Sequence, residues 1–243
     1  MVAVFGAAAV MLAAFVKGSI GFGFPPLATP LLALITDVKT AIAVLLIPNI
    51  VMDAAQLFRL GDFAGVARRM AVLLVFGAVG TLLGTWLLVL LPASAATLTL
   101  GVFALIFVAL GVTHAQPEIP AAWTRWVAPP VGIVAGILGG VTNGPGVALV
   151  IYFYSLRMPK HEFIRSVAFT FVVYKVVQLG SVVWFGLLTW HLLGISLGLT
   201  VVAVAAFAVG LKIQDRLEQR TFNRVILVVL AVLGVWLVVR SLR

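Results

Sequence analysis

Ten apolar runs make up most of this chain of 243 residues. They are rich in Leu, Val, Ala and Phe, without the strict alternation of a half-buried strand. Backbone N–H and C=O groups cannot stay unpaired in hydrocarbon, so a spanning segment is a helix or part of a closed barrel. The runs therefore predict membrane helices at residues 2–17, 24–35, 39–58, 70–91, 96–113, 127–138, 145–156, 162–186, 190–211 and 222–239.

The composition excludes a soluble enzyme. Hydrophobic residues are 63% of the chain and charged residues 9%, against about 45–50% and about 25% in a soluble domain. The net charge of +9 is explained by basic cytoplasmic loops rather than by nucleic-acid binding. The chain has no Cys, and its three His lack metal-ligand spacing. We expect an all-α polytopic membrane protein without catalytic residues, metal or cofactor.

Two Gly/Pro-rich breaks interrupt the apolar pattern, at residues 17–26 and 136–146. Gly18 and Gly21 match Gly136 and Gly139 at a constant offset, which indicates an internal repeat. Each break lies between two runs shorter than a full span. We therefore predict one membrane domain, 1–243, made of repeat one (1–113), a linker (114–126) and repeat two (127–243). Each repeat has a broken hairpin of short helices followed by three transmembrane helices.

Loop charges predict that the two repeats are inverted. Basic residues follow the third span in the first half but follow the fourth span in the second half. By the positive-inside rule the halves then lie in opposite senses, with both chain ends outside. The predicted cytoplasmic basic residues are Arg59, Arg68, Arg69, Arg125, Arg157, Lys160, Arg165, Lys212, Arg216, Arg220 and Arg224.

The first break predicts an anion site. Lys17 directly precedes Gly18, Gly21 and Gly23, and glycine-rich turns let successive N–H groups converge on an anion. A half-helix beginning near Phe24 would add its positive end. Alternatively, the first span crosses fully and Lys17 extends to the headgroups.

The second break offers polar groups at the corresponding place. Asn143 could hydrogen-bond a substrate oxygen, or it could serve only to allow a left-handed turn. Paired breaks in an inverted repeat are typical of a midplane substrate site in secondary transporters. The predicted substrate-binding residues are Lys17, Gly18, Gly21, Gly23, Gly139, Gly140, Thr142, Asn143 and Gly144.

A polar stripe lies on the third span of each half. Asn49, Asp53 and Gln56 share one helix face, and their repeat mate carries Lys175 and Gln178. These five residues are predicted to gate the site or to couple transport: Asp53 would take a proton or a cation while Lys175 neutralises an anion. The alternative is a structural role, with each side chain held by a carbonyl or a headgroup.

The two breaks and the third spans resemble the TauE/SafE sulfite exporter family, also called the TSUP family. The similar segments are residues 18–30 with Gly-x-Gly and a following Pro, residues 136–146 with Gly-Gly-x-x-Asn-Gly-Pro, and the turn at residues 158–160. The resemblance implies a bacterial inner-membrane permease for sulfite or organosulfonates such as sulfoacetate.

The residues themselves indicate a secondary transporter with a midplane oxyanion site. The expected partners are a small anion, membrane lipid, protons as a candidate coupling ion and a second copy of the chain as a candidate homodimer, but no nucleic acid. Two alternatives remain: a cation- or proton-coupled carrier that uses Asp53, and a non-transporting membrane scaffold.

Overall fold

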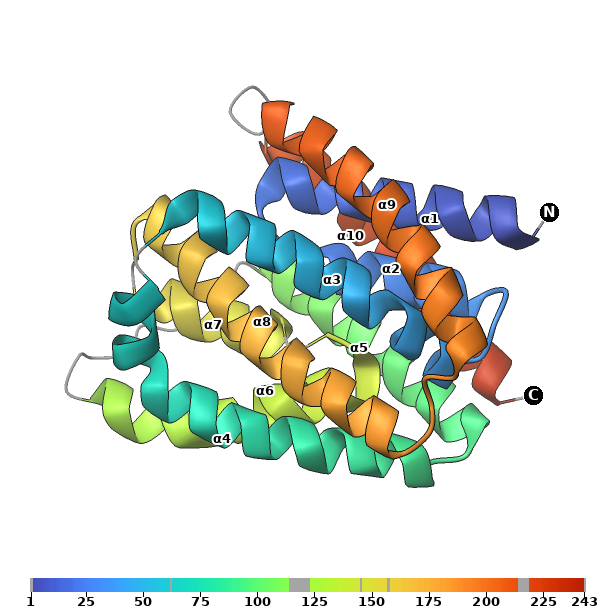
Figure 1. The fold of residues 1–243 in the computed structure, drawn as a ribbon, viewed down its shortest axis with the longest axis horizontal. Coiled ribbons are helices and arrows are strands. Elements are labelled where there is room, and N and C mark those ends of the chain that lie inside the picture. The colour runs from blue at the N-terminus through green and yellow to red at the C-terminus, as the bar shows by residue number, and fades with distance from the viewer. Residues whose placement is uncertain are drawn as a thin grey trace.

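The computed structural model describes residues 2–61, 63–113, 123–144, 146–156, 158–213 and 219–242. All regular structure in these ranges is helical (Figure 1). The helices are α1 (Val2–Ile20), α2 (Phe24–Ala33), α3 (Val38–Leu60), α4 (Phe63–Leu90), α5 (Ala93–Thr113), α6 (Thr124–Thr142), α7 (Gly146–Ser155), α8 (Lys160–Trp184), α9 (Trp190–Ile213) and α10 (Gln219–Ser241).

Each predicted run coincides with one of these helices, which confirms the all-α fold. Among the described residues, α1, α3, α4, α5, α6, α8 and α9 are long and apolar enough to cross a membrane. Exposed Val, Leu and Phe side chains cover the outside of the bundle, as they do on a surface that faces lipid. The chain is a multi-pass membrane protein.

The first helix of each hairpin is longer than predicted. Both α1 and α6 have 19 residues, so the prediction that all four hairpin helices are short was wrong for these two. Gly18, Gly136 and Gly140 remain helical because each packs against the backbone of a neighbouring helix, which is α9 for Gly18 and α4 for the other two. Close packing without a Cβ offsets the low helix propensity of glycine.

The real breaks are therefore brief. The first is Gly21–Gly23, where Gly21 and Gly23 have φ of 89° and 104°. The second includes Asn143, with φ of 64°, and Gly144. Left-handed backbone costs glycine nothing, and asparagine tolerates it better than most residues. Pro25 and Pro26 then open α2, where the missing N–H would have had no helical acceptor.

The two hairpins enter the bundle from opposite ends. The end of α2 returns to the end where α1 begins, where Arg240 donates to the Ala33 carbonyl at 2.8 Å. The α6–α7 hairpin opens instead at the end that holds the α3–α4 connection (Figure 1). At this second end the Arg69 guanidinium lies 3.4 Å from Glu162 and joins the starts of α4 and α8. Both breaks therefore lie inside the bundle.

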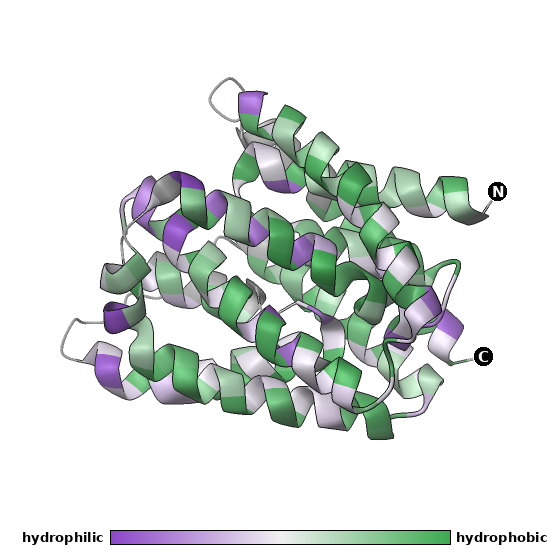
Figure 2. Ribbon diagram, in the orientation of Figure 1, coloured by the Kyte–Doolittle hydropathy of each residue, from purple (hydrophilic) through white to green (hydrophobic). Residues whose placement is uncertain are grey.

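Packing between the halves holds these breaks in place. α1 packs on α9 and α6 packs on α4, while α3 contacts α8 and α5 contacts α10. Figure 2 shows hydrophobic ribbon over most of the bundle, with hydrophilic segments at the helix ends and at mid-length of α3 and α8. The interior hydrophilic segments mark the candidate site.

Candidate functional site

A buried ion pair joins α1 to α3. Lys17 Nζ lies 2.5 Å from Asp53 Oδ1 and also donates to Asn49 Oδ1 at 3.2 Å. The three side chains are at most 1% exposed. Asn49 and Asp53 are four residues apart on α3, so one helix face presents both oxygens to the lysine. Lys17 therefore faces the protein interior and does not extend to the headgroups.

The second lysine binds the second break. Lys175 Nζ on α8 donates to the Asn143 carbonyl at 2.8 Å, to the Asn143 side-chain oxygen, and to Gln178 Oε1 at 2.7 Å. The left-handed backbone of Asn143 lets both of its oxygens meet one ammonium group. Lys175 has no carboxylate partner among the described residues, and its side chain is fully buried.

Two glutamines in matched positions hold the ends of the broken helices. Gln56 Nε2 donates to the Gly21 carbonyl at 3.0 Å. Gln178 Nε2 donates to the Gly139 and Gly140 carbonyls at 3.1 and 3.2 Å. Carbonyls near a helix C-terminus lack intrahelical donors, so each side chain satisfies backbone groups that hydrocarbon cannot.

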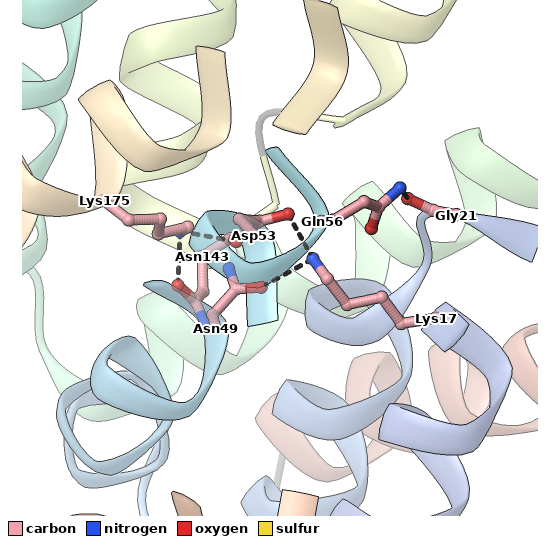
Figure 3. Close-up of polar contacts among 7 residues, drawn as sticks. All are labelled: Lys17, Gly21, Asn49, Asp53, Gln56, Asn143 and Lys175. Atoms are coloured by element: carbon pink, nitrogen blue, oxygen red, sulfur yellow. Dashed lines mark hydrogen bonds and ion pairs between the residues drawn. The ribbon is translucent and has the colours of Figure 1, made fainter. Parts of the chain in front are cut away.

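Contacts across the halves bring the lysines into one site. Figure 3 shows Lys17 and Lys175 reaching in from opposite sides, with Asn49, Asp53 and Asn143 between them. Lys17 Nζ also lies 5.7 Å from the ring centre of Phe171, one turn before Lys175 on α8.

The second break also contacts the first hairpin across the repeats. Asn143 Nδ2 donates to Thr29 Oγ1 on α2 at 3.1 Å. Sequence reasoning missed Thr29 and Phe171. Thr29 is the one hydroxyl-bearing residue in the apolar helix α2, which is a signal that could have been noticed, whereas Phe171 had none.

Several buried polar atoms of the site have no hydrogen-bond partner among the described residues. They are Asn49 Nδ2, which is a donor, and the acceptors Asp53 Oδ2 and Gln56 Oε1. An unpaired buried polar group costs about 1–3 kcal/mol. All three lie on the face of α3 that meets Lys17 and the first break. The site thus retains unused capacity for a polar ligand.

The predicted glycines mostly have structural roles, in helix packing and in backbone hydrogen bonds. Gly18 and Gly140 pack on neighbouring helices, while Gly21, Gly139 and Gly140 offer carbonyls to the glutamines. The Gly21 N–H donates to the Lys17 carbonyl at 2.7 Å, and the Gly144 N–H donates to Thr142 Oγ1 at 3.3 Å. Side chains therefore supply the groups that face the centre of the site. A direct contact between these glycines or Gly23 and a substrate stays a prediction.

The fold and the site define the class of protein: a polytopic helical membrane protein with broken helices and buried charges at its centre, which is the architecture of a secondary transporter. The family model of the sulfite exporter TauE/SafE matches residues 6–237. The chain belongs to this family and is a membrane transporter of the anion-exporter type. No curated protein and no solved structure matches the chain.

Proposed function

We propose that the chain exports sulfite or a small organosulfonate such as sulfoacetate by alternating access around the site of Lys17, Lys175 and Asn143. The observation that carries the proposal is a charge imbalance, because the site holds two buried lysines but one carboxylate, which is paired with Lys17. An isolated charge in a low-dielectric interior is costly, and a bound anion would neutralise it. A cation would add to the excess, so the charge balance argues against the cation carrier.

One unpaired hydrogen-bond donor supports an oxyanion. Asn49 Nδ2 is a buried donor without an acceptor, and it shares α3 with Asp53, which binds Lys17. An oxyanion offers several acceptors to an amide and two ammonium groups at once. The members of this predicted binding set are Lys17, Gly18, Gly21, Gly23, Gly139, Gly140, Thr142, Asn143 and Gly144, with Asn49, Asp53, Gln56, Lys175 and Gln178 as gating or coupling residues.

Exchange of the two halves supports the alternating-access part of the proposal. In this exchange α1–α5 take the places of α6–α10 in order, and α6–α10 take the places of α1–α5. The α1–α9 contact then becomes the α6–α4 contact, and the α3–α9 contact becomes the α8–α4 contact. All four contacts are present in the structure. The α3–α8 and α5–α10 contacts map onto themselves. Such exchange is expected of an inverted repeat whose halves rock around a central site.

We place the chain in a bacterial inner membrane, and the position of its basic residues supports an orientation with the basic end inside. The end of α3, the starts of α4 and α8 and the end of α9 lie at one end of the bundle (Figure 1), and the predicted cytoplasmic residues within these described segments belong to that end. Arg157 and residues 214–218, which include Arg216, fall outside the described residues. Export would then carry the anion from this basic end to the end that holds the chain termini.

A proteoliposome assay tests the proposed function. Purified protein should release trapped sulfite or sulfoacetate, and Lys17→Ala together with Asn143→Ala should abolish the flux. Lys212→Ala, at an exposed position on α9, is the matched control and should leave the flux intact. Undiminished flux in the double variant would exclude this site. No flux of any small anion, with a stable complex between the chain and another membrane protein, would favour the scaffold.

A further inference from the structure

The two lysines differ in their charge partners. Lys17 is neutralised by Asp53 at 2.5 Å, whereas Lys175 is surrounded by amide oxygens of Asn143 and Gln178. Amide oxygens stabilise an ammonium group but do not cancel its charge. With both lysines protonated and Asp53 ionised, the net charge of the three groups is positive by one, and this excess is located at Lys175.

We propose, resting on the proposed oxyanion function, that the charge of the anion decides whether a proton binds with it, and that Asp53 Oδ2 is the proton acceptor. A monoanion neutralises Lys175 and leaves the Lys17–Asp53 pair unchanged. A dianion also needs Lys17, which must then release Asp53. The freed carboxylate takes one proton that comes from solvent, so that the site is again neutral.

Geometry identifies Asp53 Oδ2 as the acceptor. Asp53 Oδ1 is bound to Lys17, while Oδ2 has no hydrogen-bond donor among the described residues. A proton on Oδ2 therefore breaks no existing contact. Once Asp53 is protonated, it no longer competes for Lys17, and the neighbouring donor Asn49 Nδ2 can meet an oxygen of the dianion.

The surroundings contain few other groups that could take the proton. α1 brings Lys17 to Asp53 and α8 brings Lys175, while Tyr174 of α8 donates instead to the Leu73 carbonyl of α4. α2 and α5 contain no titratable residue. The buried residues of α9 are Ser196, Ala203, Ala206, Phe207 and Gly210, and the titratable residues of α4, Arg68 and Arg69, lie in its first two turns.

Sulfate and methanesulfonate form a matched pair for the test. Both are compact sulfur oxyanions whose charge is fixed near neutral pH, and sulfate carries one more negative charge than methanesulfonate. Each is titrated into the purified full chain in weak buffer, and proton uptake and affinity are measured across neutral pH. We expect about one proton to be taken up per sulfate bound. The affinity for sulfate should therefore fall about tenfold for each unit by which the pH rises. Methanesulfonate should bind without a proton and without this slope.

The variant Asp53→Asn should bind sulfate without proton uptake, whereas Glu162→Gln, a carboxylate change at the rim, should behave as the wild type does. Equal proton uptake with both anions, or no uptake with sulfate in the wild type, would overturn the proton coupling. Uptake that persists in Asp53→Asn would overturn Asp53 as the acceptor. Each of these results would leave the oxyanion site in place. The wild-type measurement decides even if Asp53→Asn does not fold. Binding of neither anion would overturn the oxyanion site and the coupling together.

Discussion

Lys17 of α1 and Asp53 of α3 form an ion pair of 2.5 Å that is fully buried in a membrane-spanning bundle. Replacing one partner leaves the other charge uncompensated, so Lys17→Met and Asp53→Asn should each destabilise the protein by about 3–5 kcal/mol. The double variant should cost less than the sum of the two, because neither charge remains.

Unfolding of the detergent-solubilised protein measures this cycle. Lys212→Met, which changes an exposed lysine on α9, is the control and should shift stability by no more than about 0.5 kcal/mol. Additive losses in the double variant would mean that the pair does not contribute as a unit.

Asn143 combines a backbone role with a side-chain role, and two substitutions separate them. Its φ of 64° suits glycine, whereas alanine there should cost about 1–2 kcal/mol of strain. Both changes remove the side-chain contacts with Lys175 and Thr29. We therefore expect Asn143→Gly to fold better than Asn143→Ala, while both lose anion flux. Full flux in the folded Asn143→Gly protein would show that the side chain is not required.

Glycines that pack between helices should respond differently from those that face outward. A Cβ on Gly140 would lie 2.5 Å from the backbone nitrogen of Thr85 on α4, whereas a Cβ on Gly194 of α9 would meet nothing within 4 Å. Gly140→Ala should therefore destabilise the protein by about 1–3 kcal/mol. Gly194→Ala should be neutral, or stabilising by up to about 1 kcal/mol through helix propensity. Thermal unfolding of the two variants compares them, and equal effects would contradict the α4–α6 packing.

These contacts explain which parts of the structure the sequence could predict. Apolar length alone predicts the helices, because hydrocarbon permits little else. The i, i+4 spacing of Asn49 and Asp53 predicts their common face, since it depends only on local helical geometry. Glycine runs were a poor guide to the breaks, because the tertiary packing that keeps Gly18 and Gly140 helical is not encoded in local propensity.

Contacts between side chains on different helices also could not be predicted from local sequence patterns. The sequence indicated that Lys17, Asp53 and Lys175 were unusual, but it could not show that Lys17 pairs with Asp53 while Lys175 binds Asn143. Those pairs depend on how α1, α3 and α8 are arranged in space. The hydrogen bonds from Lys175 to the break between α6 and α7 depend on the same arrangement.

Asp37 should make stability depend on acidity at the end of the bundle where α3 begins. It is the N-cap of α3 and accepts a hydrogen bond from the Thr40 N–H at 3.0 Å. Partial burial opposes ionisation, but the hydrogen bonds from Thr40 and nearby backbone groups prevail and hold the pKa of Asp37 below its ordinary value. The ionised Asp37 carboxylate thus stabilises the folded protein at any pH above the ordinary pKa of an aspartate. This contribution is lost as the pH falls through the lowered pKa of Asp37.

Replacing the cap tests this assignment. Asp37→Ala should cost about 1 kcal/mol at neutral pH and progressively less in acid. Asp37→Asn keeps an acceptor oxygen, so it should cost less and show no such pH dependence. Unfolding measured against pH distinguishes the variants, and a cost of Asp37→Ala that does not decline in acid would contradict a contribution from the ionised carboxylate.

Sidedness can be tested directly, because the chain has no cysteine to remove. Ala64 and Lys212 are exposed at the end where α4 begins and α9 ends, while Ser94 and His191 are exposed where α5 and α9 begin. The basic end should face the cytoplasm. Single cysteines at Ser94 and His191 should therefore react with an impermeant maleimide in intact bacterial cells, while those at Ala64 and Lys212 should react only after lysis. Because each pair has one member in each half, labelling of Ala64 and Lys212 from opposite sides would contradict the inverted arrangement.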